Sequence, residues 1–270
     1  APYRFAQIYG SENAVGDYIY WSKDIYQCFE VARVENARYS QRIVNHAKDV
    51  MDYTSWGDES QLIYESLVTG ESCYNSRFCV SCWPGVREST YCIECHSSAD
   101  LFGCVGLNKK QYCILNKQYT KEEYERLVPK IIAHMNEMPY TDAKGRVYKF
   151  GEFYPPEHSP LAYNESVGQD YRPETKESAL ANGFQWRDPN PKEYEITLKT
   201  EDIPDHVKDA PDTITKELIQ CASCKKAYRI AAMELRYLRQ WGIALPRKCF
   251  GCRHLERIAL RNPFRWYHRA

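Results

Sequence analysis

The chain has 270 residues, with 36 Lys or Arg against 36 Asp or Glu, so its formal net charge is zero. This length is sufficient for two folded units, each with its own core. No run of about eighteen apolar residues occurs, which argues against a membrane-spanning helix. The 22 Tyr and 12 Cys are unusually many and indicate repeated, closely spaced packing positions.

Residues 1–118 are predicted to form a Tyr- and Cys-rich parallel β-solenoid. Aromatic residues follow steps of 11 and then 10 in two series: Tyr53, Tyr64 and Tyr74, and then Tyr91, Phe102 and Tyr112. A solenoid needs a near-constant step because each coil places an inward residue over the one below. The prediction therefore makes Tyr53 and Tyr74 equivalent positions one coil apart. An antiparallel β-domain with strands ten residues apart is the alternative.

Eight cysteines lie in this region, and four of them could bind a second metal ion: Cys79, Cys82, Cys92 and Cys95. Their two Cys-x-x-Cys spacings suit a metal, and His96 is an alternative ligand. Stacked, buried thiols are the competing interpretation, because free Cys is among the most buried residue types. A thiol enzyme using Cys92 or Cys95 beside His96 is a further alternative that requires an accessible, electropositive setting.

Residues 119–138 are predicted to form a helix that covers the end of the solenoid. Thr120 and Glu123 have the spacing of a capping box, and apolar residues such as Leu127 and Ile131 recur at helical steps. An exposed terminal coil would be a sheet edge that invites aggregation, which gives the helix its expected role. Pro129 lies in the middle of the pattern and is expected to kink the helix.

Residues 139–215 are interpreted as an extended connector that wraps the folded parts. Nine Pro lie between positions 139 and 220, together with long polar stretches and several aromatic residues. A free linker would not need so many aromatics, so they are expected to act as anchors. A short helix is expected in the run TKESALANG.

Residues 216–270 carry the strongest chemical signal, two Cys-x-x-Cys pairs formed by Cys221, Cys224, Cys249 and Cys252. Two such pairs complete the tetrahedral shell that Zn²⁺ prefers, and the metal replaces a core too small for about fifty residues. The expected arrangement is a treble clef or zinc ribbon: a hairpin at the first pair, a helix near residues 231–241, and a helix opened by the second pair. The overall fold class is thus mainly β with α.

Helical periodicity predicts which side chains of these two helices share a face. In the first helix, Met233, Tyr237 and Trp241 are expected on one side, together with Leu238. In the second, Leu255 is expected to face inward, with Ile258 and Ala259, and the arginines are expected outside.

Disulfides or free buried thiols are the alternatives to zinc. Disulfides require an oxidising compartment, whereas the run APYRFAQIYG lacks a basic segment followed by an apolar one. A cytoplasmic location is therefore expected.

Charge is distributed unevenly along the chain. Residues 221–270 contain nine Arg and three Lys against two Glu, whereas residues 151–220 contain fifteen acidic and seven basic residues. A basic terminus suggests RNA or DNA as a partner. The candidate contacts are Arg253, Arg257, Arg261 and Arg265 for phosphates, and Trp266 or Tyr267 for bases. The alternative is a protein-assembly module whose basic end docks on an acidic surface, its own connector included.

Enzyme signatures do not emerge from the sequence. It has no Gly-rich phosphate loop, no Gly-x-Ser-x-Gly elbow and no His-Glu-x-x-His helix, and its seven His are scattered. Four Cys around one zinc leave no open coordination position for catalysis. A non-enzymatic binding protein without a small-molecule substrate is therefore predicted.

Several runs of the sequence resemble a known family: AKDVMDYTSWGD, FGCVGLNKKQYCILNKQYTKEEYERL, ITKELIQCASCKKAYRI and LPRKCFGCRHLERIALRNPFRWYHR. The similarity is to uncharacterised zinc-ribbon, Cys/Tyr-rich repeat proteins of candidate-phyla bacteria with reduced genomes, and it covers nearly the whole chain. Members often carry a further Cys-rich ribbon ahead of the point where this chain begins, which would make the chain a piece of a longer protein. The resemblance implies the fold and the metal but no biochemical activity.

Overall fold

The structure is a computed structural model that describes residues 6–188 and 194–261. Contacts divide the chain into two compact units, Ala1–Pro155 and Pro156–Ala270. No helix in the described part is long and apolar enough to cross a membrane.

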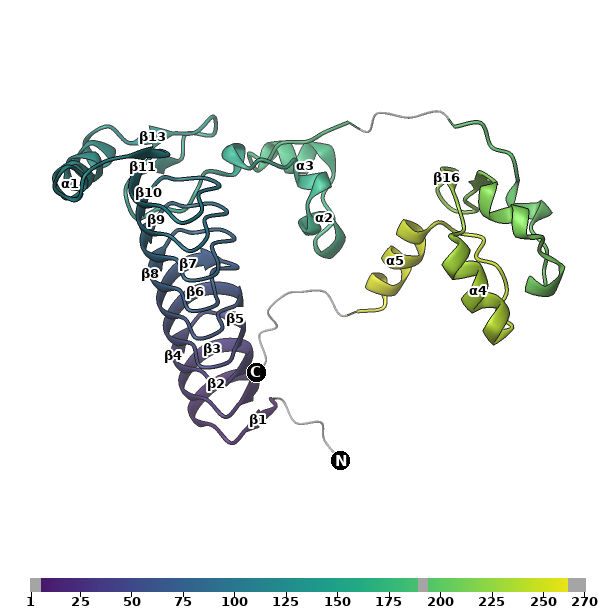
Figure 1. The fold of residues 1–270 in the computed structure, drawn as a ribbon, viewed down its shortest axis with the longest axis horizontal. Helices are drawn as coiled ribbons and strands as arrows, with labels where there is room; N and C mark the ends of the chain where they lie inside the picture. Colours follow the sequence, from purple (N-terminus) through teal and green to yellow (C-terminus); the bar gives the residue numbers. More distant parts are fainter. Residues whose placement is uncertain (1–5, 189–193, 262–270) are drawn as a thin grey trace. The chain divides into compact units, whose positions relative to one another are not determined.

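The first unit is a parallel β-solenoid, as predicted, in which the coils stack from β1 to β11 (Figure 1). Its strands are β1 (Ile8–Tyr9), β2 (Glu12–Tyr20), β3 (Lys23–Ala32), β4 (Glu35–Arg38), β5 (Gln41–Val44), β6 (Lys48–Trp56), β7 (Gln61–Leu67), β8 (Tyr74–Arg77), β9 (Arg87–Thr90), β10 (Ala99–Phe102), β11 (Gln111–Ile114) and β12 (Lys117–Gln118). Strand pairs from β1 to β11 are parallel, and β12 turns back antiparallel to β11.

The length of a coil differs from the prediction. Lys23 pairs with Glu35, twelve residues later, and Glu35 pairs with Lys48, thirteen residues later. Tyr53 pairs with Ser66, so the predicted equivalence of Tyr53 and Tyr74 is wrong. The step between aromatic residues does not give the coil length, because these tyrosines occupy different positions within a coil. Tyr53 is buried in the core, whereas Tyr74 is exposed.

A three-residue repeat of the backbone underlies each coil. From Tyr18 to Asn45, every third residue has a positive φ in the left-handed region. The residue that follows each of these, from Ile19 to Ile43 in the same steps, is buried. Left-handed residues turn the chain so that one side chain in three points into the core. Val68 is the only β-branched residue among the described non-glycine residues with positive φ, consistent with the steric cost of that conformation.

Inward serines satisfy backbone N–H groups inside the solenoid. Ser66 donates its hydroxyl to the carbonyl of Tyr64, at 2.9 Å, and accepts the N–H of Cys79 in the next coil, at 3.1 Å. Ser22 and Ser40 accept the N–H of an inward residue one coil later in the same way, and Ser98 accepts that of the exposed Lys110. A small polar side chain at these positions therefore pairs a buried donor that would otherwise destabilise the fold.

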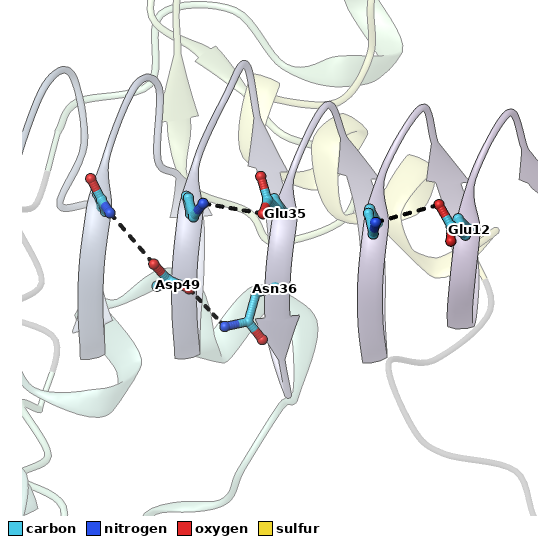
Figure 2. Close-up of polar contacts among 7 residues, drawn as sticks. Glu12, Glu35, Asn36 and Asp49 are labelled. Carbon is cyan, nitrogen blue, oxygen red and sulfur yellow. Dashed lines mark hydrogen bonds and ion pairs between the residues drawn. The ribbon is translucent and has the colours of Figure 1, made fainter.

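The outer surface has its own ladders between coils. Lys23 and Lys48 form ion pairs with Glu12 and Glu35, at 3.6 and 3.1 Å. Asp49 accepts hydrogen bonds from the amides of Asn36 and Gln61, at 2.7 and 3.5 Å. Figure 2 shows these contacts as rungs between neighbouring coils. Opposite charges placed directly across two strands favour that register over alternatives.

The end of the solenoid is covered by helix α1 (Lys121–Glu137), as expected from its sequence pattern. Thr120 and Glu123 form the predicted capping box, and Pro129 lies inside the helix. Tyr124 of α1 packs on Tyr112 of β11, with ring centroids 5.9 Å apart. A hairpin of β13 (Tyr140–Thr141) and β14 (Val147–Tyr148) follows, and residues 149–155, here called the strap, then pack on the solenoid at Phe78 and Tyr91.

The second unit consists of short elements and a small core. Its helices and strands are α2 (Val167–Tyr171), α3 (Lys176–Ala181), β15 (Ile219–Gln220), β16 (Ala227–Tyr228), α4 (Ala232–Trp241) and α5 (Phe250–Ala259), with 3₁₀ turns at Pro156–His158, Tyr163–Glu165, Thr200–Asp202, Val207–Asp209 and Asp212–Lys216. The helix α3 confirms the expectation for TKESALANG. One apolar cluster combines connector residues such as Ile203 and Ile214 with Ile230, Leu235 and Leu245. Part of the connector is thus built into the fold around the cysteine pairs.

Replacing Ser66 by Ala should destabilise the solenoid, because the buried N–H of Cys79 loses its acceptor. We expect a loss of about 1–3 kcal/mol in the free energy of unfolding, measured by urea denaturation. The matched control is Ser66→Cys, which places at position 66 the same small polar residue that occupies the equivalent inward position 79. This variant should lose less stability than Ser66→Ala. Equal stabilities of Ser66→Ala and the parent chain would contradict this role.

Candidate metal centre

Four cysteines meet where a hairpin faces the start of a helix. Cys221 directly follows β15, and Cys224 lies in the turn before β16, which pairs antiparallel with β15. Cys249 is the N-cap of α5, and Cys252 lies in its first turn. This is the predicted arrangement, in which the first pair sits on a hairpin and the second pair opens a helix.

The four sulfur atoms are close enough to share one ion. The Sγ atoms of Cys221 and Cys252 are 3.9 Å apart, and those of Cys224 and Cys249 are 3.7 Å apart. All four Sγ atoms lie within 4.8 Å of one another, and this is the only such group of three or more metal-ligating side chains in the described part of the chain. The cluster could therefore hold a metal ion.

Backbone groups prepare one of the thiols to become a thiolate. Burial alone would raise the pKa of Cys221, but N–H groups of Cys249, Cys224 and Ser223 outweigh it and lower that pKa to about 6. The N–H of Cys249 reaches the Sγ of Cys221 at 3.2 Å. By contrast, thiol contacts with Cys224 and Cys249 raise the pKa of Cys252 to about 12. A bound cation is what would allow all four sulfurs to be ionised together.

Arginines fix the acidic connector against this unit. Arg239 donates to Asp212 at 2.5 Å and to the carbonyl of Ala210 at 2.6 Å. Arg247 donates to Asp205 at 2.5 Å and to two connector carbonyls, those of Thr200 and Ile203. Sequence analysis did not single out these two arginines as anchors, because their partners lie 27 to 47 residues away.

The predicted arginine stripe is only partly available. Arg253 pairs with Glu234 at 3.0 Å, and the guanidinium of Arg261 lies 4.8 Å from the ring centroid of Tyr171. Arg257 is exposed. The remaining predicted contacts, Arg265, Trp266 and Tyr267, lie outside the described residues. The expectation that all the arginines of α5 face solvent is therefore wrong for Arg253, which turns toward α4.

The buried faces of α4 and α5 also differ from the prediction. Leu235 and Leu238 face the core, whereas Met233, Tyr237 and Trp241 are exposed. Leu255 of α5 and Ala259 are exposed as well. Helical periodicity correctly placed Met233, Tyr237 and Trp241 on one side of α4, but that side faces solvent.

The second candidate cluster lies inside the solenoid. Cys79, Cys82, Cys92 and Cys95 are each fully buried. Their S–H groups donate to backbone carbonyls two residues earlier, for example from Cys79 to Arg77 at 3.3 Å and from Cys92 to Thr90 at 3.4 Å. Within the described residues these four cysteines are not among the groups of ligand atoms close enough to share one ion. Cys92 and Cys95, the candidate nucleophiles of a thiol enzyme, are both 0% exposed to solvent.

Comparison with known proteins finds no matching family model, curated protein or solved structure. The fold and the cysteine cluster are thus the basis for any statement about function.

Replacing Cys249 should abolish metal binding and loosen the second unit. We expect the Cys249→Ser variant to retain less than one tenth of the bound metal of the parent chain, because the loss of one ligand breaks the shell on which folding of such small units depends. Elemental analysis of protein purified without chelator measures this. The control is Cys113→Ser in the solenoid, which should leave metal content unchanged; a metal-free parent chain would contradict the assignment.

Proposed function

We propose that the chain is a non-enzymatic binding protein in which Cys221, Cys224, Cys249 and Cys252 hold one structural Zn²⁺. Tetrahedral zinc with four thiolate ligands at about 2.3 Å has sulfur–sulfur edges of about 3.8 Å. The two Sγ–Sγ distances of 3.7 and 3.9 Å fit that geometry, and all four Sγ atoms lie within 4.8 Å of one another. Four thiolates fill every position around the ion, which supports a structural role. Thiols that bind metal must stay reduced, so a reducing compartment, the cytoplasm, is part of the proposal.

The proposed partner of the zinc unit is single-stranded RNA or DNA, bound on the exposed face of α4. The observation that carries this proposal is an aromatic pair: Tyr237 and Trp241 stack at 5.4 Å with an interplanar angle of 10°, and both are exposed. The guanidinium of Arg236 lies 5.8 Å from the Tyr237 ring centroid. Aromatic rings beside a cation are the usual platform for unpaired bases, and each stacked base contributes about 1–3 kcal/mol.

Internal ion pairs limit the charge available for phosphates. Arg239, Arg247 and Arg253 are engaged by carboxylates of the same unit. Exposed cations remain at the metal-binding turn, in Lys225 and Lys226, and on α5 in Arg257. With about three phosphates neutralised, the logarithm of the binding constant should fall against the logarithm of salt concentration with a slope of roughly −2 to −3.

A second candidate function is a protein-assembly module built on the solenoid. It is favoured by the docking of the acidic connector on Arg239 and Arg247, which accounts for the uneven charge without an external ligand. Exposed aromatic side chains on the solenoid add a surface suited to protein partners.

Binding of a fluorescently labelled single-stranded 20-mer of RNA or DNA tests the first candidate. The double variant Tyr237→Ala, Trp241→Ala should weaken binding at least about tenfold, because two stacking contacts are lost. Arg257→Ala should reduce the salt slope by about one. The matched control is Trp21→Ala, which removes an exposed tryptophan from the solenoid and should change neither quantity. Failure of micromolar RNA and DNA to bind at about 50 mM salt would refute the nucleic-acid proposal.

A further inference from the structure

Aromatic and apolar side chains line two adjacent outward columns of the solenoid. In the first column, Tyr26, Arg38, Met51, Tyr64 and Arg77 are paired from coil to coil. The second column holds the residue that follows each of them. The exposed aromatic and apolar members of both columns, Tyr26, Tyr39, Met51 and Tyr64, are here called the tyrosine track.

The upper end of these columns is already covered by a segment of the chain. Phe78 and Phe102 are only 2% and 6% exposed, and Phe150 of the strap packs edge-on against Phe78, at 6.3 Å between ring centroids. Tyr91 accepts the N–H of Gly151 and donates to the carbonyl of Glu152, both at 3.0 Å. The strap thus shows how this surface holds an extended chain: a tyrosine hydroxyl binds its backbone and aromatic side chains meet edge to face.

The tyrosine track continues this surface without a cover. Tyr26, Tyr39, Met51 and Tyr64 are between 37% and 46% exposed. The ring of Tyr64 packs edge-on against Phe78, at 5.7 Å, so the track is continuous with the covered part. Tyr26 and Tyr39 make the same kind of pair at 5.6 Å. The exposed rings therefore repeat the contacts that the strap already uses.

Carboxylates mark the junction between the covered and exposed parts. Asp52 and Glu65 occupy the second column between Tyr39 and Phe78, and Glu152 of the strap lies near them. Burial raises the pKa of Glu65, and the charges of Asp52 and Glu152 raise it further. Within residues 6–188 and 194–261, none of these three carboxylates has an ion pair within 4.0 Å, although Arg38 and Arg77 flank them in the first column. A cation brought by a partner would complete this group.

We propose that the tyrosine track binds an extended peptide segment of a partner protein, carrying aromatic side chains and one lysine or arginine. The four coils from Tyr26 to Tyr64 span three inter-strand steps, about 14 Å, which corresponds to about four or five extended residues. The aromatic side chains pack edge to face on the track, and the cation lies at Asp52 and Glu65 beside the Tyr64 ring. The inference rests on the assembly function and is independent of nucleic-acid binding by the zinc unit.

The full chain and two fluorescein-labelled hexapeptides test this inference by fluorescence anisotropy. One peptide has the strap sequence of residues 149–154, which already contains Lys149, and the other, here called the lysine peptide, carries a second lysine in place of Glu152. The lysine peptide should bind about three- to tenfold more tightly, because it replaces a repelled carboxylate with a cation. The double variant Tyr39→Ala, Tyr64→Ala should weaken its binding about tenfold. Tyr74→Ala, an equally exposed tyrosine in another column, is the matched control and should have no effect.

Three results would overturn the inference. The first is that neither peptide binds at a concentration of about 1 mM. The second is that Tyr74→Ala weakens binding as much as the double variant does. The third is binding that resists Tyr39→Ala, Tyr64→Ala but fails in Tyr91→Phe, which would show that the peptide displaces the strap instead. Asp52→Asn keeps the test valid if the double variant misfolds, since it should remove the preference for the lysine peptide. In each case the outcome with RNA or DNA is unaffected.

Discussion

The backbone hydrogen bonds between neighbouring coils are the constraint on which the solenoid depends. Each coil places about one residue in three in the left-handed region, and that conformation costs roughly 1–2 kcal/mol for a residue other than glycine. A single coil could not offset such a cost. Only the ladder to the coils above and below, together with burial of every third side chain, makes the conformation favourable. The inward serines belong to the same system because they pair N–H groups inside the stack.

This dependence explains the structures at the end of the solenoid. The last parallel strand, β11, is followed by an antiparallel strand and by α1, so its edge does not continue as a parallel ladder. The strap adds aromatic contacts along the side. The second unit is stabilised differently: its apolar cluster is small, and arginine contacts to the connector hold its short elements together. Its four clustered cysteines could hold a metal ion in addition.

The sequence predicted the fold class, the capping helix and the four clustered cysteines, because each has a local signature. Cys-x-x-Cys pairs and the Thr120–Glu123 capping box are defined by spacing alone. The coil length was missed because tyrosines at similar steps occupy different columns, so side-chain type did not reveal register. The true signal was a small or apolar residue at every third position, as from Ile19 to Ile43.

The orientation of the arginines could not be predicted for a different reason. Arg253 turns inward to meet Glu234, and Arg239 meets Asp212, contacts that depend on tertiary packing between distant segments. Tyr237 and Trp241 were likewise predicted to share one side of a helix, but an amphipathic pattern identifies a stripe and not whether that stripe is covered.

The ladder in Figure 2 also restricts how the solenoid can change in length during evolution. Acidic and basic residues alternate in the order Glu12, Lys23, Glu35, Lys48. The neighbouring column alternates as Asn13, Asp24, Asn36, Asp49. Loss of one coil from this part would set Lys23 against Lys48 and Asp24 against Asp49. Loss of two coils would restore the alternation. A single exposed pair contributes little free energy. Across several coils, however, only the gain or loss of two coils at a time keeps acidic residues opposite basic ones, so we expect coils to be gained or lost there most easily in twos.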